Sequence, residues 1–114
     1  MEFKIDDLTV VYGNQKSYYG KAKVIYTHDN RVVLRSYDTN VASFHIDTQK
    51  LYINGYFSNT TSKHQWEFMK QLHKDFEEVY KNICDNEGFK SFKAFLEHTT
   101  VIDYQNKTYK AHHH

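Results

Sequence analysis

The sequence predicts an α+β fold, in which an antiparallel meander of four or five strands packs against one long helix, followed by a short helix and a C-terminal strand. Two patterns lead to this prediction. Up to about residue 57, apolar side chains alternate with polar ones, as in strands that bury one face. From Ser62 onward they recur every three or four residues, as along one side of a helix. A hydroxyl-rich stretch, Ser58 to Ser62, lies between the two patterns.

Composition supports a single folded domain. The 114 residues include 39% hydrophobic and 17% aromatic residues, which is enough apolar surface for a hydrophobic core. The absence of proline and the presence of only four glycines argue against long linkers. We therefore expect one α+β domain over residues 1–111, and we interpret the histidines at 112–114 as a purification-tag remnant.

Several classes of protein are disfavoured by the sequence. No apolar run approaches the roughly 20 residues that a membrane-spanning helix needs, and the first residues do not resemble a signal peptide. Cys84 is the only cysteine, so no internal disulfide can form, and a reducing, intracellular location is expected. The net charge of +1 is spread evenly along the chain, which argues against a DNA mimic and against a strong duplex binder.

Five segments are predicted as strands because β-branched and aromatic residues alternate with polar ones in each. They are Leu8–Tyr12, Tyr18–Thr27, Arg31–Tyr37, Val41–Ile46 and Leu51–Phe57. The short connections between them are typical of hairpins, so we expect sequential neighbours in a meander. The side chains expected to face the core are Ala22, Val24, Tyr26, Val32, Leu34, Ala42, Phe44, Ile46, Leu51, Ile53 and Phe57. The solvent-exposed face is expected to carry Arg35, His45, Tyr52 and Tyr56.

The long helix is predicted from an apolar stripe that continues to residue 83. Its members are Trp66, Met69, Leu72, Phe76, Val79, Tyr80 and Ile83. Thr61 or Ser62 is the expected N-cap, with Gln65 reaching back to complete a capping box, and Gly88 is the expected left-handed C-cap. A shorter helix is expected from Phe89 to His98, and Thr99 to Lys110 is expected to return to the sheet edge as one strand or a small hairpin.

Two sequence pieces carry a resemblance to a known family. They are S-Y-D-T-N-V-A at residues 36–42 and N-G-Y-F-S-N-T-T-S-K-H-Q at residues 54–65. They resemble a family of small, mostly phage-encoded proteins of unknown function, in which a strand with S-Y-x-T-x-V-A precedes a second strand that ends Y-x-S-x-T-T-S-x-H before a helix. The resemblance covers about residues 35–70.

This resemblance implies a phage or prophage origin, and hence the cytoplasm of a bacterial host cell. It brings no activity, so no catalytic residue follows from it. By analogy, small phage proteins without enzymatic motifs often bind and redirect or inhibit a host or defence component. We therefore expect a non-enzymatic inhibitor-type binding protein without a cofactor. Its expected partner is a host or bacterial-defence protein, for example one that processes nucleic acid.

The first candidate site is the exposed face of the sheet. Tyrosines there alternate with bases, and Tyr and Arg concentrate binding energy in protein interfaces. The expected partner-binding residues are Tyr18, Tyr19, Arg35, Tyr37, Tyr52 and Tyr56. The same combination can stack single-stranded nucleic acid. The near-neutral charge favours a protein partner.

The second candidate site is the start of the long helix. Free N–H groups and the positive end of the helix dipole attract anions, and hydroxyl groups add donors. The residues concerned are Thr60, Thr61, Ser62, Lys63 and His64. As an alternative function, they would bind a phosphate of a nucleic acid or a small nucleotide. Helix capping alone explains one of these hydroxyl groups.

The histidines and the cysteine do not form a recognisable metal or catalytic motif. His64 and His73 lack the H-E-x-x-H spacing of helical zinc sites, so no metal is expected. Cys84 has no partner in motif spacing and is interpreted as a buried thiol. An exposed meander edge, together with Phe89, Phe92 and Phe95, is compatible with a homodimer.

Overall fold

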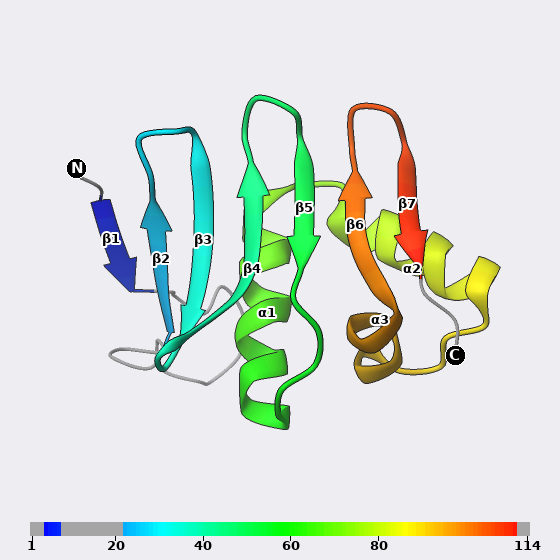
Figure 1. Cartoon of the computed structure of the whole chain (residues 1–114). Coiled ribbons are helices and arrows are strands. Elements are labelled where there is room, and N and C mark those ends of the chain that lie inside the picture. Colours follow the sequence, from blue (N-terminus) through cyan, green and yellow to red (C-terminus); the bar gives the residue numbers. More distant parts are fainter. Residues whose placement is uncertain (1–3, 8–21, 112–114) are drawn as a thin grey trace.

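The computed structural model describes residues 4–7 and 22–111, with side chains for residues 22–111 (Figure 1). Its strands form one sheet in which every strand pairs antiparallel with its neighbours in sequence. They are β1 (Lys4–Asp7), β2 (Ala22–Tyr26), β3 (Arg31–Ser36), β4 (Thr39–His45), β5 (Lys50–Ile53), β6 (Thr99–Asp103) and β7 (Thr108–Ala111). The predicted α+β class and the meander are thus confirmed, with more strands than expected.

In the described part of the chain, three helices pack against one face of this sheet. They are α1 (Asn59–Leu72), α2 (Phe76–Glu87) and α3 (Phe92–His98). In Figure 1, α1 lies behind β4 and β5, and α2 lies behind the β6–β7 hairpin. Among the described residues, no helix has the length and apolar character needed to cross a membrane. We call the sheet face that carries none of these helices the open face.

The core lies between the sheet and the helices. The sheet contributes alternate residues, among them Val32 and Leu34 of β3, and the helices contribute Phe68, Phe76 and Phe95. Most of the side chains predicted to face inward do so. The exceptions are Tyr26, Ile46 and Phe57, whose exposed fractions are 41%, 44% and 47%. Each is exposed because it lies at or beyond the end of its strand.

One strand prediction falls wholly, and another partly, outside the described residues. Leu8–Tyr12 lies there entirely, as does the beginning of Tyr18–Thr27. Within the described part, that second strand is β2, which begins at Ala22. The predicted strands are therefore observed from residue 22 onward, and β1 at Lys4–Asp7 is a further strand before them.

The prediction of one long helix is wrong, because the chain leaves the helix at His73. This residue has an extended backbone (φ −140°, ψ 125°), and its ring stacks on Tyr104, with 3.8 Å between ring centroids and 9° between planes. The helix resumes at Phe76 as α2. Leu72 and Phe76 both pack on the same core, so the apolar spacing continues in phase across the break. Periodicity alone therefore could not reveal it.

The C-terminal segment is a hairpin, which is the second of the two arrangements expected for it, and not a single strand. β6 pairs with β5 and β7 pairs with β6, which extends the meander to seven strands. Gly88 adopts the expected left-handed conformation (φ 76°) at the end of α2, where its N–H donates to the Cys84 carbonyl at 2.8 Å. The short helix begins later than predicted, at Phe92, with Ser91 as its N-cap.

The N-cap of α1 is Ser58, not Thr61 or Ser62. Its hydroxyl accepts the Thr61 backbone N–H at 3.1 Å. Gln65 does not form the predicted capping box. Its side-chain amide instead donates to the Val41 carbonyl at 3.1 Å and to the Gly55 carbonyl at 2.9 Å, so this side chain ties α1 to the β-sheet.

Candidate binding site on the open face of the sheet

Strand β3 supplies both charged and apolar side chains to the open face. Because side chains alternate along a strand, Val32 and Leu34 enter the core while Arg31, Val33 and Arg35 lie on the open face. The strand register extends this pattern sideways. Ile25 of β2 is opposite Val33, and Lys23 is opposite Arg35.

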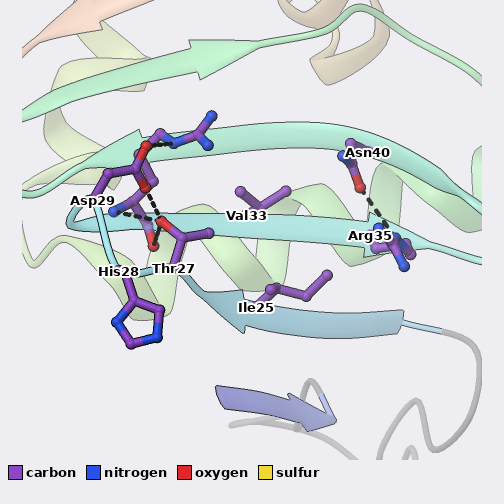
Figure 2. Close-up of a pocket in the computed structure, with 8 residues that line it drawn as sticks. Ile25, Thr27, His28, Asp29, Val33, Arg35 and Asn40 are labelled. Atoms are coloured by element: carbon purple, nitrogen blue, oxygen red, sulfur yellow. Dashed lines mark hydrogen bonds and ion pairs between the residues drawn. The ribbon is translucent and has the colours of Figure 1, made fainter. Parts of the chain in front are cut away.

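Ile25, Arg31, Val33 and Arg35 are among the residues that line a pocket of about 470 Å³ above β2 and β3. Figure 2 shows Ile25 and Val33 in its middle, with Arg35 and Asn40 towards one end and Thr27, His28 and Asp29 towards the other. Ile25 and Val33 are 4% and 8% exposed, so they form the floor and the polar residues form the rim. An apolar floor with a few placed polar groups is the usual composition of a ligand site.

A β-bulge places Asn40 at the Arg35 end of the pocket. Leu34 pairs with Ala42, but Arg35 pairs with Asn40, so Val41 is an extra residue in β4. Bulges of this kind redirect a side chain. Here the Asn40 side-chain oxygen accepts the Arg35 Nε–H at 3.2 Å, which fixes the orientation of the guanidinium group.

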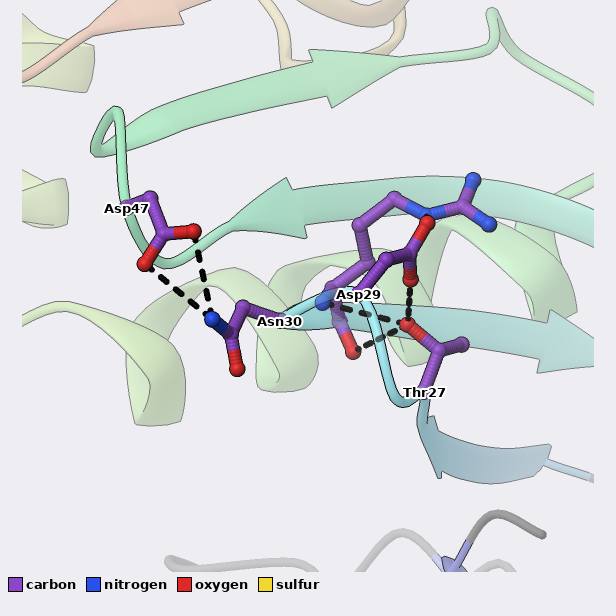
Figure 3. A network of polar contacts seen from close by, with 5 residues as sticks. Thr27, Asp29, Asn30 and Asp47 are labelled. Atoms are coloured by element: carbon purple, nitrogen blue, oxygen red, sulfur yellow. Dashed lines mark hydrogen bonds and ion pairs between the residues drawn. The ribbon is translucent and has the colours of Figure 1, made fainter. Parts of the chain in front are cut away.

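The opposite end of the pocket is a hydrogen-bonded turn between β2 and β3 (Figure 3). The Thr27 hydroxyl donates to the Asp29 carboxylate and accepts the Arg31 backbone N–H at 3.1 Å. Arg31 Nε donates to Asp29 Oδ2 at 2.9 Å. Asn30 links this turn to the turn between β4 and β5 through its side-chain amide, which lies 3.2 Å from each carboxylate oxygen of Asp47.

The two ends of the pocket differ in charge. The pKa of the Asp29 carboxyl is lowered by the hydrogen bond from Thr27 and then by that from Arg31, so Asp29 is ionised and balances Arg31. Among the described side chains, no carboxylate forms an ion pair with Arg35, whose cross-strand neighbours are Lys23 and Asn40. The Arg35 end is therefore the more positive one.

The structure separates the predicted partner-binding residues. Arg35 and Tyr52 lie on the open face, where the Tyr52 ring is 4.7 Å from the His45 ring between centroids. Tyr56 does not lie there. It packs partly buried against the core, its hydroxyl donates to Asn59 Oδ1 at 2.7 Å, and Lys93 Nζ lies 5.0 Å from its ring centroid. Tyr18 and Tyr19 are outside the described residues.

Tyr37 occupies the turn between β3 and β4. Its side chain is 54% exposed, and its backbone is left-handed (φ 55°), a conformation that is uncommon for a bulky residue. Its ring centroid lies 6.1 Å from that of His64. Tyr37 therefore lies at the edge between the sheet and the start of α1.

The predicted anion-binding residues divide into buried and exposed members. Ser36 Oγ lies 3.0 Å from Thr61 Oγ1 and 2.9 Å from His64 Nδ1, and these three residues are 3%, 5% and 0% exposed. The Ser62 hydroxyl donates to the Asn59 carbonyl at 2.7 Å. Thr60 and Lys63 are exposed. The buried network joins α1 to β3, so its first role is to fix the position of the helix.

The distance between Ser36 Oγ and His64 Nδ1 is like that in a catalytic serine–histidine dyad, but the resemblance ends there. A nucleophile must be reachable by substrate. Ser36 and His64 are enclosed between β3 and α1, with exposed fractions of 3% and 0%. Their geometry is thus that of a packing contact between a strand and a helix.

A second pocket, of about 480 Å³, lies between α2 and the β6–β7 hairpin. Asp75, Glu78 and Asn82 line it from the helix, and Tyr104 and Tyr109 line it from the hairpin. Burial raises the pKa of the Tyr104 hydroxyl, with a further contribution from the charge of Asp75. Tyr109 donates to Glu87 Oε1 at 2.9 Å, which holds the hairpin against α2.

Cys84 and the histidines do not assemble a metal site in the part of the chain that the structure describes. No group of three or more His, Cys, Asp or Glu side chains there has the arrangement to hold a metal ion. Cys84 is half-buried, and burial raises the pKa of its thiol. Such a thiol is less reactive than an exposed one.

Together, the fold and the pocket define a sheet-and-helix α+β domain with a candidate ligand site on its open face. Residues 7–86 match the model of a family of unknown function, DUF8033, and the chain belongs to this family. Comparison with curated proteins and comparison with solved structures gave no match. The matched residues include the open-face pocket and the buried network at α1, whereas α3 and the β6–β7 hairpin lie beyond them.

Proposed function

We propose that this protein is a small, phage-type, non-enzymatic binding protein that attaches to a host or bacterial-defence protein and modulates or inhibits it. The observation that carries the proposal is the open-face pocket, with its apolar floor of Ile25 and Val33 and its arginine at the rim. Arginine beside a desolvated apolar pocket is typical of the residues that dominate binding energy in protein interfaces.

The sequence resemblance supports the phage-type assignment. The S-Y-D-T-N-V-A piece, at residues 36–42, spans the β3–β4 turn and the bulge that orients Arg35. The second piece, at residues 54–65, spans the start of α1. Both pieces thus coincide with parts of the molecule that position the open face or fix the helix behind it. On this proposal the protein acts in the cytoplasm of a bacterial cell.

Direct binding of nucleic acid or a nucleotide at the start of α1 is less well supported. Thr61 and His64 are committed to the buried network with Ser36. The hydroxyl group of Ser58 caps the helix, and that of Ser62 bonds to Asn59. Few hydrogen-bond donors of the predicted anion-binding residues therefore remain for an anion.

The proposal is tested by affinity capture from bacterial lysate with a matched pair of variants. Arg35→Glu reverses the charge at the pocket, and Lys81→Glu makes the same change at an exposed position on α2. We expect a stoichiometric partner that the wild-type protein and Lys81→Glu retain and that Arg35→Glu loses. Retention by all three proteins, or the lack of any stoichiometric partner, would contradict the proposal.

A further inference from the structure

We propose that the open-face pocket binds an extended, acidic segment of the partner protein, with a carboxylate on Arg35 and an apolar side chain over Ile25 and Val33. This inference rests on the proposed function and specifies the chemistry of the partner. It follows from three properties of the pocket: the spacing of its side chains, the distribution of its charge and the nature of its floor.

The spacing is that of a strand. Arg31, Val33 and Arg35 are alternate residues of β3, so their side chains recur about every 6.6 Å along the pocket. Alternate side chains of an extended peptide recur at the same interval. A segment that lies along β3 with acidic, apolar and acidic residues at alternate positions therefore places its apolar side chain opposite Val33 and its acidic side chains opposite the two arginines, of which Arg31 is already paired with Asp29. The pocket volume of about 470 Å³ is within the usual range for ligand sites, roughly 300–1,000 Å³.

The charge distribution identifies Arg35 as the main anchor. Arg31 is already paired with Asp29 at 2.9 Å. Arg35 uses its Nε–H for Asn40, which holds the guanidinium plane. Within the described part of the chain its terminal nitrogens have no hydrogen-bond partner, so they can bind a carboxylate. Lys23, opposite Arg35 in the register, adds positive charge at this end, although Asp7 of β1 is in turn opposite Lys23. Arg35 is thus the cation that gains most from an acidic partner.

The floor favours a protein over a nucleic acid. Single-stranded nucleic acid binds through aromatic platforms on which bases stack, together with unopposed positive charge. This pocket has two branched aliphatic side chains at its centre, which offer no flat platform on which a base could stack. The net charge of the chain is only +1. Ile25 and Val33 instead match an aliphatic or aromatic side chain of a protein.

Synthetic peptides provide the test. A fluorescent peptide with Glu, Leu and Glu at alternate positions is titrated with the whole protein, and fluorescence polarisation reports binding. A peptide of the same composition with both acids adjacent, and a single-stranded oligonucleotide, are titrated in parallel. We expect the alternating peptide to bind most tightly. We expect Arg35→Glu to weaken it by about tenfold or more, and Lys81→Glu to change it less than about twofold.

Exchanging the charges of Arg35 and of the peptide distinguishes a direct contact between them from an effect of the substitution on folding. Arg35 is exposed, and an unfolding curve of each variant checks that the domain remains intact. If the Arg35–carboxylate contact exists, a peptide with Lys in place of its Glu residues should bind Arg35→Glu better than it binds the wild type. Equal affinity of both acidic peptides, or binding of the oligonucleotide but not the peptides, would overturn the inference.

The two proposals fail in different ways. Loss of the captured partner in Arg35→Glu, without binding of the alternating peptide, would overturn the acidic-segment inference and leave the proposed function standing. Failure of both the capture experiment and the peptide titration would reject both.

Discussion

Ser36 connects β3 to α1 through the buried network with Thr61 and His64. In Ser36→Ala the hydroxyl is lost and its two partners remain buried, a situation that costs about 1–3 kcal/mol. We therefore expect the free energy of unfolding to fall by about this amount, measured by urea denaturation. Ser43→Ala, a serine of β4 opposite Val33 in the register, is the matched control and should change stability by less than about 0.5 kcal/mol. Equal effects of the two changes would show that the network does not hold the helix.

Tyr37 combines an exposed ring with a left-handed backbone. This conformation costs a non-glycine residue about 1–2 kcal/mol, and glycine adopts it freely but loses about 0.5–1 kcal/mol through the entropy of the unfolded chain. Tyr37→Gly should therefore leave stability unchanged or raise it by up to about 1.5 kcal/mol in thermal unfolding. If Tyr37 contributes to the partner surface, the same variant should capture less partner from lysate. A clear loss of stability would instead show that the ring is needed for folding.

At the residue scale, alternation correctly predicted that Arg35 faces away from the core but could not reveal what fixes it. The pairing of Arg35 with Asn40 depends on the extra residue Val41, and two adjacent apolar residues, Val41 and Ala42, do not by themselves identify a bulge. Tyr56 was misplaced for a related reason. The strand ends at Ile53, so alternation no longer applies three residues later.

At the scale of elements, the break between α1 and α2 has a tertiary cause. The His73 ring stacks on Tyr104, which follows β6, and its Nδ1 accepts the Asp75 backbone N–H at 3.2 Å. His73 makes both contacts with an extended backbone. Because Tyr104 is 31 residues further along the chain (104 − 73), no local pattern could indicate this break. The strands were easier to predict because each pairs with its immediate neighbour in sequence.

His73 should make stability depend on pH. Burial, followed by the charge of Lys74, lowers its pKa below the ordinary value of 6.5, although Asp75 acts in the opposite direction. The unfolded chain therefore takes up a proton at a higher pH than the folded one. The contribution of His73 to stability is present above pH 6.5 and is lost as the pH falls through the lower pKa of the folded state.

The variant His73→Phe tests this linkage, because it keeps an aromatic ring for stacking on Tyr104 but cannot titrate. We expect the free energy of unfolding to decline less steeply below pH 6.5 in the variant than in the wild type. Urea denaturation at a series of pH values measures the difference. The same slope in both proteins would assign the pH dependence to other groups.

At the scale of the whole molecule, the sheet and its helices form one core that extends beyond the family-matched residues. The family match ends at residue 86, within α2, yet α3 and β6 contribute Phe95, Leu96 and Ile102, each no more than 1% exposed. The sequence predicted the α+β class from periodicity. It did not define the final hairpin, because the apolar alternation in Thr99–Asp103 is weak and pairing with β5 determines the strand.

This shared core predicts that the family-matched part does not fold stably alone. A chain that ends at Gly88 lacks Phe95, Leu96 and Ile102, and losing one large core side chain typically costs about 2–5 kcal/mol. The summed loss is comparable to the roughly 5–15 kcal/mol of total stability in a small domain. The truncation also exposes the edge of β5 that β6 covers in the whole chain. We expect circular dichroism of this fragment to show no cooperative thermal transition, whereas a chain that ends at Ala111 keeps the wild-type transition. A cooperative transition in the shorter fragment would mean that β1–β5, α1 and α2 have a sufficient core of their own and that the C-terminal hairpin only extends the sheet.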